Sequence, residues 1–284
     1  NKYCSLRFDF QSFNKKSIGS KDKIVVITGG SDGIGKALVA LFLALGAKVA
    51  TCGRTQSKLD DLAREFNSPN LLVITADVSQ QSDCTSFIEK VVSQWGTIDI
   101  LINNAGISMR ALVKEVSIDT LKNVMDINFW GAVYCTKAAL PFITQNKGVI
   151  VGVSSIAGYR GLPGRSGYSA SKYALNGWLE ALKTELYGSG THVMWVCPGF
   201  TTSNIRNAAL DKDAKAQGES PMNEGEMMSS EVCATHIIAA IGKRKRTLVL
   251  TFTGKRTVFM NKFFPAWADK LVHHFFFKEG RLVK

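Results

Sequence analysis

The chain has 284 residues, of which 45% are hydrophobic and 20% are charged. This composition is typical of a globular protein and excludes a disordered chain. The longest apolar run, around Ala37–Leu45, is shorter than the roughly 18 residues that a membrane-spanning helix needs. The net charge is +12, with +4 in residues 1–23, −1 in residues 24–240 and +9 in residues 241–284, so the positive charge lies at the two ends. A nucleic-acid-binding fold would spread its basic residues over the folded body, so we expect no nucleic-acid partner.

Strand-like and helix-like segments alternate along the middle of the chain. Short apolar runs that are typical of strands buried on both faces cover residues 23–28, 47–52, 71–75, 98–102, 148–153, 191–197 and 247–252. Segments with helical spacing cover residues 34–45, 56–66, 82–95, 118–145, 167–187 and 230–241. This alternation predicts an α/β protein with a doubly wound Rossmann fold, in which helices cover both faces of a mainly parallel, seven-stranded sheet.

We expect a single domain over residues 23–252, because no linker rich in Pro, Gly or Ser divides it. Within it, residues 204–230 are polar and irregular, which favours a loop over the substrate; a plain surface excursion is the alternative. Residues 1–22 form an N-terminal extension that fits no part of the core. The chain lacks an initial Met, which leaves open a membrane anchor upstream of it.

Residues 253–284 form a basic, aromatic C-terminal extension. Its segment Lys255–Lys278 mixes Phe, Trp, Met and Val with basic residues and holds one acid, Asp269. This pattern suits an amphipathic element that lies on an anionic membrane surface. A helix over the substrate pocket or against a partner subunit has the same pattern, since amphipathicity does not identify what the apolar face contacts. Both interpretations stay open.

The six cysteines form no C-x-x-C pair and are not spaced with histidines as in a zinc site. They are expected to be buried free thiols, which favours a reducing compartment and a cytoplasmic location, with or without membrane association.

A glycine-rich turn, Thr28–Gly35, follows the first strand and opens the first helix. Its spacing is G-x-x-x-G-x-G. Glycines there let the backbone approach a pyrophosphate, and the helix N-terminus offers free N–H groups and the positive end of its dipole. Any strand-to-helix turn can need glycine, so the motif alone is a moderate signal. The candidate cofactor-binding residues are Gly29, Ser31, Asp32, Gly33, Ile34 and Gly35.

The second strand ends in Cys-Gly-Arg, with Arg54 where NAD-binding sites place an acid for the ribose 2′-hydroxyl. A guanidinium can pair with a 2′-phosphate, so the sequence predicts NADP, with NAD less favoured. An exposed loop charge is the alternative interpretation. Asp32 would oppose the phosphate, and Ser31 could supply a compensating hydroxyl.

The fourth strand is followed by Asn103-Asn104-Ala105-Gly106. This turn lies at the carboxyl edge of the predicted sheet, where ligands bind in this architecture. Small residues there let a cofactor lie close, which makes Asn104, Ala105 and Gly106 candidates; an ordinary turn would look similar.

Tyr168 and Lys172 stand four residues apart on a predicted helix, so their side chains share a face. A phenol is a poor acid–base group at neutral pH unless a nearby positive charge stabilises its phenolate, and an ammonium or an oxidised nicotinamide does so. Ser155 follows the fifth strand, and its hydroxyl can bond a substrate carbonyl.

With these motifs in this order, the chain resembles the short-chain dehydrogenase/reductases of the Tyr-x-x-x-Lys branch. The matching motifs run from Thr28 to about Ser203 and include the glycine turn, the Asn-Asn-Ala-Gly segment, Asn128 within Asp-Ile-Asn-Phe-Trp-Gly, and Pro198-Gly199.

The resemblance implies roles for individual residues. Tyr168 is the general acid when a ketone is reduced and the base when an alcohol is oxidised, and Lys172 holds the nicotinamide ribose and lowers the Tyr168 pKa. Ser155 orients the carbonyl, and Asn128 bends its helix and holds a water in a proton relay. Further cofactor contacts are implied for Asp77, Val78, Pro198, Gly199, Thr201 and Ser203, the last standing where the family usually has Thr.

The resemblance therefore implies hydride transfer between NADP(H) and a carbonyl or secondary alcohol, without a metal. In its Cys-Gly-Arg sequence after the second strand and its basic, aromatic tail, the chain is similar to reductase groups that act on hydrophobic lipid-, steroid- or sphingoid-like carbonyls. These are the hydroxysteroid dehydrogenases, the 3-ketosphinganine reductases and the dehydrogenase/reductase 7 type. The alternatives are a 3-oxoacyl-thioester reductase of lipid synthesis and a non-catalytic dinucleotide-sensing protein. A homodimer or homotetramer is implied as well.

Overall fold

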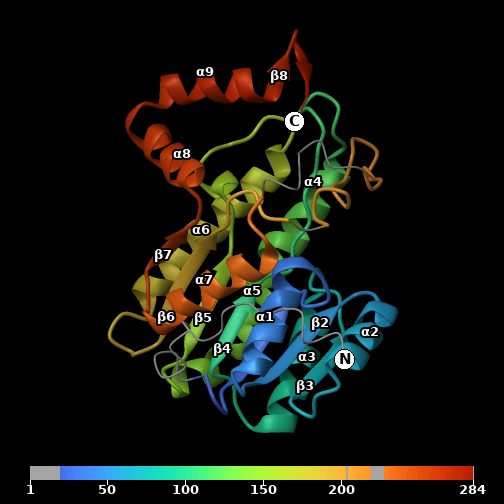
Figure 1. The fold of residues 1–284 in the computed structure, drawn as a ribbon, viewed down its shortest axis with the longest axis vertical. Coiled ribbons are helices and arrows are strands. Elements are labelled where there is room, and N and C mark those ends of the chain that lie inside the picture. Colours follow the sequence, from blue (N-terminus) through green and yellow to red (C-terminus); the bar gives the residue numbers. More distant parts are fainter. Residues whose placement is uncertain (1–19, 203, 219–226, 284) are drawn as a thin grey trace.

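The computed structural model describes residues 20–202, 204–218 and 227–283. A seven-stranded sheet forms its centre, with all neighbouring strands parallel in the order β3-β2-β1-β4-β5-β6-β7 (Figure 1). The predicted Rossmann-like α/β fold is therefore confirmed. Its strands are β1 (Ile24–Thr28), β2 (Lys48–Gly53), β3 (Leu71–Thr75), β4 (Ile100–Asn103), β5 (Val149–Val153), β6 (His192–Cys197) and β7 (Thr247–Val249).

Helices cover both faces of the sheet. On one face pack α1 (Gly33–Ala44) and α7 (Ser230–Gly242), and on the other pack α3 (Gln81–Trp95), α5 (Gly131–Gln145) and α6 (Ser166–Glu185). The shorter helices α2 (Gln56–Phe66) and α4 (Ile118–Met125) complete this part. All five residues of β1 are buried, and they alternate: Val26 faces the α3 side while Val25 and Ile27 face the α1 side. This two-sided burial explains the continuous apolar runs of the strands.

The segment predicted as one helix over residues 118–145 is interrupted. It forms α4, then a π-helical turn η3 (Asp126–Trp130), then α5. A π-turn inserts an extra residue per turn and re-aims the side chains around it. The prediction of a continuous α-helix was thus wrong at this turn.

The last predicted strand, residues 247–252, was too long. β7 ends at Val249, and Thr251 caps the next helix by accepting a hydrogen bond from the Gly254 N–H. Beyond it the chain forms α8 (Phe252–Phe263) and α9 (Pro265–Phe276), which lie apart from the sheet at the top of Figure 1. A small antiparallel hairpin, β8 (Phe277–Lys278) and β9 (Arg281–Leu282), follows and was not predicted.

Polar contacts attach α8 and α9 to the rest of the molecule. Arg160 pairs with Asp269 of α9 at 2.5 Å and donates a 2.9 Å hydrogen bond to the Asn261 side chain of α8. The Asn261 amide donates in turn to the Tyr159 carbonyl at 2.7 Å. The division into residues 1–22, 23–252 and 253–284 stays a prediction; the first 19 residues, 219–226 of the proposed substrate loop and Lys284 lie outside the described residues.

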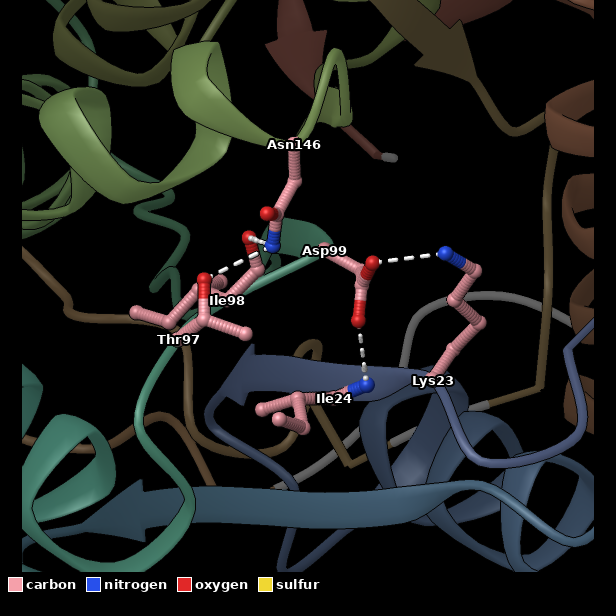
Figure 2. Close-up of polar contacts among 6 residues, drawn as sticks. All are labelled: Lys23, Ile24, Thr97, Ile98, Asp99 and Asn146. Carbon is pink, nitrogen blue, oxygen red and sulfur yellow. Dashed lines mark hydrogen bonds and ion pairs between the residues drawn. The ribbon is translucent and has the colours of Figure 1, made fainter.

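A buried carboxylate joins the amino ends of β1 and β4 (Figure 2). Asp99 accepts hydrogen bonds from the Lys23 ammonium at 2.7 Å and from the Ile24 backbone N–H at 2.9 Å. Beside it, the Asn146 amide donates to the Thr97 hydroxyl at 2.7 Å. These contacts fix the edge of the sheet formed by the amino ends of the strands. Ligands bind in such folds at the other edge, formed by the carboxyl ends.

Candidate active site

A cavity of about 660 Å³ lies along the carboxyl ends of the strands. It extends from the glycine turn to the catalytic candidates and on to α9. All but two of the predicted site residues line it. Those that do are Gly29, Ser31, Asp32, Gly33, Ile34, Gly35, Arg54, Asp77, Val78, Asn104, Ala105, Gly106, Ser155, Tyr168, Lys172, Pro198, Gly199 and Thr201. Asn128 lies behind the wall, and Ser203 lies outside the described residues.

The glycine turn has no room for side chains at its closest approach. A Cβ on Gly35 would lie 2.1 Å from the Gly29 carbonyl oxygen, and Gly29 itself has a φ of +69°, where L-residues are strained. Asp32 is the N-cap of α1, and its carboxylate accepts a 2.7 Å hydrogen bond from the Gly33 N–H. The open backbone before a 12-residue helix fits a dinucleotide pyrophosphate. The predicted Asp32 is thus a helix cap at the cavity wall.

Two exposed cations lie where β2 ends. Arg54 and Lys58 both line the cavity there, together with Ser31 of the glycine turn. Sequence reasoning missed Lys58, although its place four residues after Arg54 at the start of a helix was a readable signal. Asp77 lines the same end, and its carboxylate accepts a 3.0 Å hydrogen bond from the Ser79 N–H.

The Asn103–Gly106 turn holds the ends of β4 and β1 together. The Asn104 amide donates to the carbonyls of Thr28 and Gly29 at 2.9 and 3.0 Å, and the Asn104 and Ala105 N–H groups both donate to the Thr28 hydroxyl. The Asn104 side-chain amide thereby fixes the glycine turn from behind. Ala105 and Gly106 line the cavity, and their small side chains leave room for a cofactor.

Asn128 lies in the π-helical turn and is 1% exposed. Its amide nitrogen donates to the Ile107 carbonyl at 2.9 Å and to the Ser171 hydroxyl at 3.0 Å, and its oxygen accepts from the Ile107 N–H at 2.8 Å. The helix is therefore distorted at Asn128, as expected. Its side chain connects the turn after β4 to the helix that carries Lys172; its part in a proton relay stays a prediction.

Ser155, Tyr168 and Lys172 come together at the middle of the cavity. Ser155 caps the 3₁₀ turn η4 (Ile156–Gly158), where its hydroxyl accepts a 3.1 Å hydrogen bond from the Ala157 N–H, and its side chain lies near the Tyr168 hydroxyl. Lys172 donates a 2.8 Å hydrogen bond to the Val153 carbonyl, with its Nζ 5.7 Å from the centre of the Tyr168 ring. All three are brought together by the end of β5 and the first two turns of α6.

Burial controls the titration of the two groups. It raises the pKa of Tyr168, while the Ser155 side chain and then the guanidinium groups of Arg165 and Arg206 act to lower it. Burial also lowers the pKa of Lys172 to about 8. A phenol next to a serine hydroxyl and a desolvated ammonium is a set suited to proton transfer at a carbonyl oxygen.

The far end of the cavity is apolar, and it agrees with one of the interpretations left open for the C-terminal segment, a helix over the substrate pocket. Side chains of α9 line it, namely Ala268, Leu271, Val272, Phe275 and Phe276. Two arginines, Arg165 and Arg206, line the same end. Only the fold places α9 over this cavity, so no local pattern could have identified these residues.

Cys52, Cys84, Cys135, Cys197 and Cys233 are buried free thiols, as predicted; Cys4 lies outside the described residues. Within the part of the chain that the structure describes, no three His, Cys, Asp or Glu side chains gather as a metal site. No helix among those residues is both long and apolar enough to span a bilayer.

Comparisons with known proteins agree with this site. The family model described as short chain dehydrogenase matches residues 23–214. The chain therefore belongs to the short-chain dehydrogenase/reductase family of oxidoreductases, which bind a nicotinamide dinucleotide.

Individual relatives lie in this family. Dehydrogenase/reductase SDR family member 7B of Mus musculus is 32% identical over 253 residues, or 86% of this chain and 78% of the mouse protein. The 11-beta-hydroxysteroid dehydrogenase 1A of Arabidopsis thaliana is 35% identical over 237 residues, or 79% of this chain and 67% of that protein. Among solved structures, an alcohol dehydrogenase from Thermococcus sibiricus complexed with 5-hydroxy-NADP has a TM-score of 0.71 at 22% identity, covering 80% of this chain and 95% of that chain. This last likeness is one of fold.

Proposed function

We propose that the protein is an NADP(H)-dependent oxidoreductase that transfers a hydride between the nicotinamide and a hydrophobic carbonyl or secondary alcohol. The observation that carries the proposal is that Ser155, Tyr168 and Lys172 line one cavity that continues to the glycine turn. Residues of that turn would hold a dinucleotide in the same cavity that these three side chains line.

Different residues bind the dinucleotide and transfer the proton. The glycine turn holds the pyrophosphate, and Lys172 bonds the nicotinamide ribose. When bound, the dinucleotide supplies or accepts the hydride. Ser155 orients the carbonyl oxygen, and the Tyr168 hydroxyl gives it a proton during reduction or takes one during oxidation. General acid help of this kind is typically worth about 100- to 10,000-fold in rate.

The preference for NADP is supported by Arg54 and Lys58. Both cations line the adenosine end of the cavity beside the Ser31 hydroxyl. A guanidinium pairs with a phosphate through two parallel hydrogen bonds, and an ammonium adds a second positive charge. The carboxylates of Asp32 and Asp77 are committed to neighbouring backbone N–H groups, which reduces their opposition to a phosphate.

A hydrophobic substrate is supported by the α9 wall. Five apolar side chains of this helix line the same cavity as Tyr168. The name of one relative, an 11-beta-hydroxysteroid dehydrogenase of Arabidopsis thaliana, is consistent with such a substrate.

The outer face of α8 and α9 is the surface for peripheral contact with an anionic membrane. Large apolar side chains there are exposed, among them Phe263, Phe264 and Trp267 at 57%, 51% and 69%. Lys255, Lys262 and Lys270 lie on the same two helices. Such a mixture binds anionic lipid through apolar insertion and charge attraction together. Co-sedimentation with phosphatidylserine vesicles should fall strongly in a Trp267→Glu variant; equal binding by the wild type and the variant would contradict this role.

A homodimer or homotetramer is supported by exposed aromatic side chains beside the site. Trp130 and Tyr173, on the turn and the helix that carry Asn128 and Tyr168, are 43% and 45% exposed. Light scattering of the purified protein measures this directly. The buried free thiols support a reducing, cytoplasmic setting.

The experiment that tests the proposed function is a screen of ketones and alcohols from short to long chain, followed by NADPH absorbance. Turnover should rise with the length of the apolar part of the substrate. Half-maximal turnover should need a far lower concentration of NADPH than of NADH. Turnover of no ketone or alcohol in the panel would contradict the proposal.

A further inference from the structure

Arg160 joins the turn that follows Ser155 to both C-terminal helices. Ser155 is the N-cap of η4, and Arg160 lies just beyond the end of that turn. The Arg160 guanidinium pairs with Asp269 of α9 at 2.5 Å and donates a 2.9 Å hydrogen bond to the Asn261 side chain of α8. The Asn261 amide donates to the Tyr159 carbonyl at 2.7 Å. One side chain therefore contacts two helices that lie about a hundred residues further along the chain.

Apolar packing contributes little to the attachment at this point. Among the described residues, the apolar core clusters and the side chains packed against them end at Leu250 and include none of α8 or α9. A second hollow of about 390 Å³ separates α9 from the segment that begins with Arg160, and Leu162 and Val272 line both this hollow and the main cavity. The Arg160 side chain is 16% exposed, so its charge-assisted hydrogen bond is partly shielded from water and fastens this end of α9.

The other end of α9 has a separate attachment. The Arg165 guanidinium lies over the Phe276 ring, with its Cζ 5.8 Å from the ring centre. The Leu282 side chain of the following hairpin packs on Gly164, where an added Cβ would lie 2.5 Å from it. Between these two attachments, Val272 of α9 lines the cavity. The helix therefore lies across the apolar end of the cavity and is held on both sides of it.

We propose that Arg160 is a positioning residue for substrate specificity: it holds α8 and α9 over the apolar end of the cavity and so confers a preference for long apolar substrates. The inference rests on the proposed function and names the residue on which its apolar wall depends. Arg160 is not among the residues that line the main cavity, so it acts through the two helices.

The length of the substrate decides how much Arg160 matters. A long ketone whose carbonyl lies at Tyr168 extends to the α9 side chains, and each methylene buried there improves binding about fourfold. A short ketone at Tyr168 gains nothing from α9. Loss of Arg160 should therefore weaken the binding of long substrates and leave short ones unaffected.

Arg160→Met tests this with the longest and the shortest ketone that the wild type reduces, such as 2-decanone and 2-butanone. The value of kcat/KM for the long ketone should fall at least about 10-fold, mainly through KM, while that for the short ketone should change less than about twofold. Asp269→Ala breaks the same ion pair from the α9 side and should show the same selective loss. Arg160→Lys should recover part of it. The matched control is Arg246→Met, which removes an exposed arginine paired with Glu180 and should change neither value.

Amide hydrogen exchange adds a measurement that needs no substrate. The amides of α8 and α9 should exchange faster in Arg160→Met than in the wild type, while those of α2 should be unchanged. NADPH affinity should be unchanged as well, because Arg160 does not line the cavity that receives the dinucleotide.

Several outcomes would overturn the positioning role and leave the oxidoreductase standing. One is a wild type that does not favour the long ketone, and another is an Arg160→Met enzyme with wild-type kcat/KM for it or with wild-type exchange in α8 and α9. An equal loss on long and short ketones is a third, because Arg160 would then support the fold as a whole. Turnover of no ketone or alcohol by the wild type is the separate outcome that refutes the proposed function itself.

Discussion

The Lys172 ammonium lies over the face of the Tyr168 ring, 5.7 Å from the ring centre. The two residues are four apart on α6, so the helix itself sets this relation. Lys172 is nevertheless 4% exposed, and its one hydrogen bond here is to the Val153 carbonyl. The site therefore holds a buried ammonium whose charge is only partly compensated. Such a group serves the reaction but lowers the stability of the folded protein.

A neutral residue at position 172 should make the protein more stable at neutral pH. The pKa of Lys172 falls from 10.5 to about 8 on folding, so below pH 8 the native state bears the full cost of a buried charge, roughly 3 kcal/mol. Between pH 8 and 10.5 the native state has lost a proton that the unfolded state keeps, so the wild type gains stability as pH rises. Lys172→Met should add about 2 kcal/mol to the free energy of unfolding at pH 7 after the lost Val153 hydrogen bond is allowed for.

Urea unfolding at pH 7 and at pH 10 measures this difference. The advantage of Lys172→Met over the wild type should shrink at pH 10. Lys90→Met, at an exposed position, should show no such pH dependence. A variant that is less stable than the wild type by the same amount at both pH values would contradict the assignment of a strained ammonium.

Reversing the charge at the end of β2 should change the cofactor preference. Arg54→Asp, alone or with Lys58→Glu, removes the cations at the adenosine end and adds a carboxylate suited to a ribose hydroxyl. The ratio of NADPH to NADH affinity should fall by at least about tenfold, since a charge-assisted hydrogen bond is worth about 1.5–3 kcal/mol. Binding titrations that follow nicotinamide fluorescence give both affinities. An unchanged ratio would remove these two residues from the 2′-phosphate site.

Adding a single methyl group to the glycine turn should abolish dinucleotide binding. In Gly35→Ala the new Cβ would lie 2.1 Å from the Gly29 carbonyl oxygen, so the turn must shift. Gly177 is the matched control because a Cβ there meets no atom within 4 Å on the same kind of helix. Gly177→Ala should bind NADPH normally and gain about 0.5–1 kcal/mol in stability. Normal NADPH affinity in Gly35→Ala would show that the turn does not hold the cofactor.

The contacts of Asp99 with Lys23 and Ile24 should affect the stability of the fold and leave turnover unchanged. Asp99→Ala leaves the buried Ile24 N–H without its acceptor, which costs about 1–3 kcal/mol. Lys23→Ala removes only the ion pair, whose lysine side chain is 47% exposed, and should cost less than about 1 kcal/mol. Denaturant midpoints rank the two variants. The same cost for both would assign the stabilisation to the ion pair instead of the backbone hydrogen bond.

The sequence predicted the parallel sheet because each strand is an apolar run bounded by turn residues, and such runs are readable one at a time. The site motifs were readable for the same reason: the glycine turn and the Tyr168–Lys172 pair are each local. The π-helical turn at Asn128 was not readable from the apolar spacing, which stays approximately helical; only the family resemblance implied a bend there. Arg165, Arg206 and the α9 wall belong to segments far apart in the chain, so only packing of the whole molecule brings them to the cavity.

The central claim is that the Tyr168 hydroxyl exchanges the proton while the nicotinamide exchanges the hydride. Single-turnover and steady-state rates of Tyr168→Phe, with NADPH affinity measured on the same sample, test it most directly. The exposed Tyr187, at 91%, provides the control Tyr187→Phe, which should behave as wild type. Tyr168→Phe should lose at least about 100-fold in kcat and bind NADPH as before. A Tyr168→Phe enzyme that turns over at the wild-type rate would contradict the account.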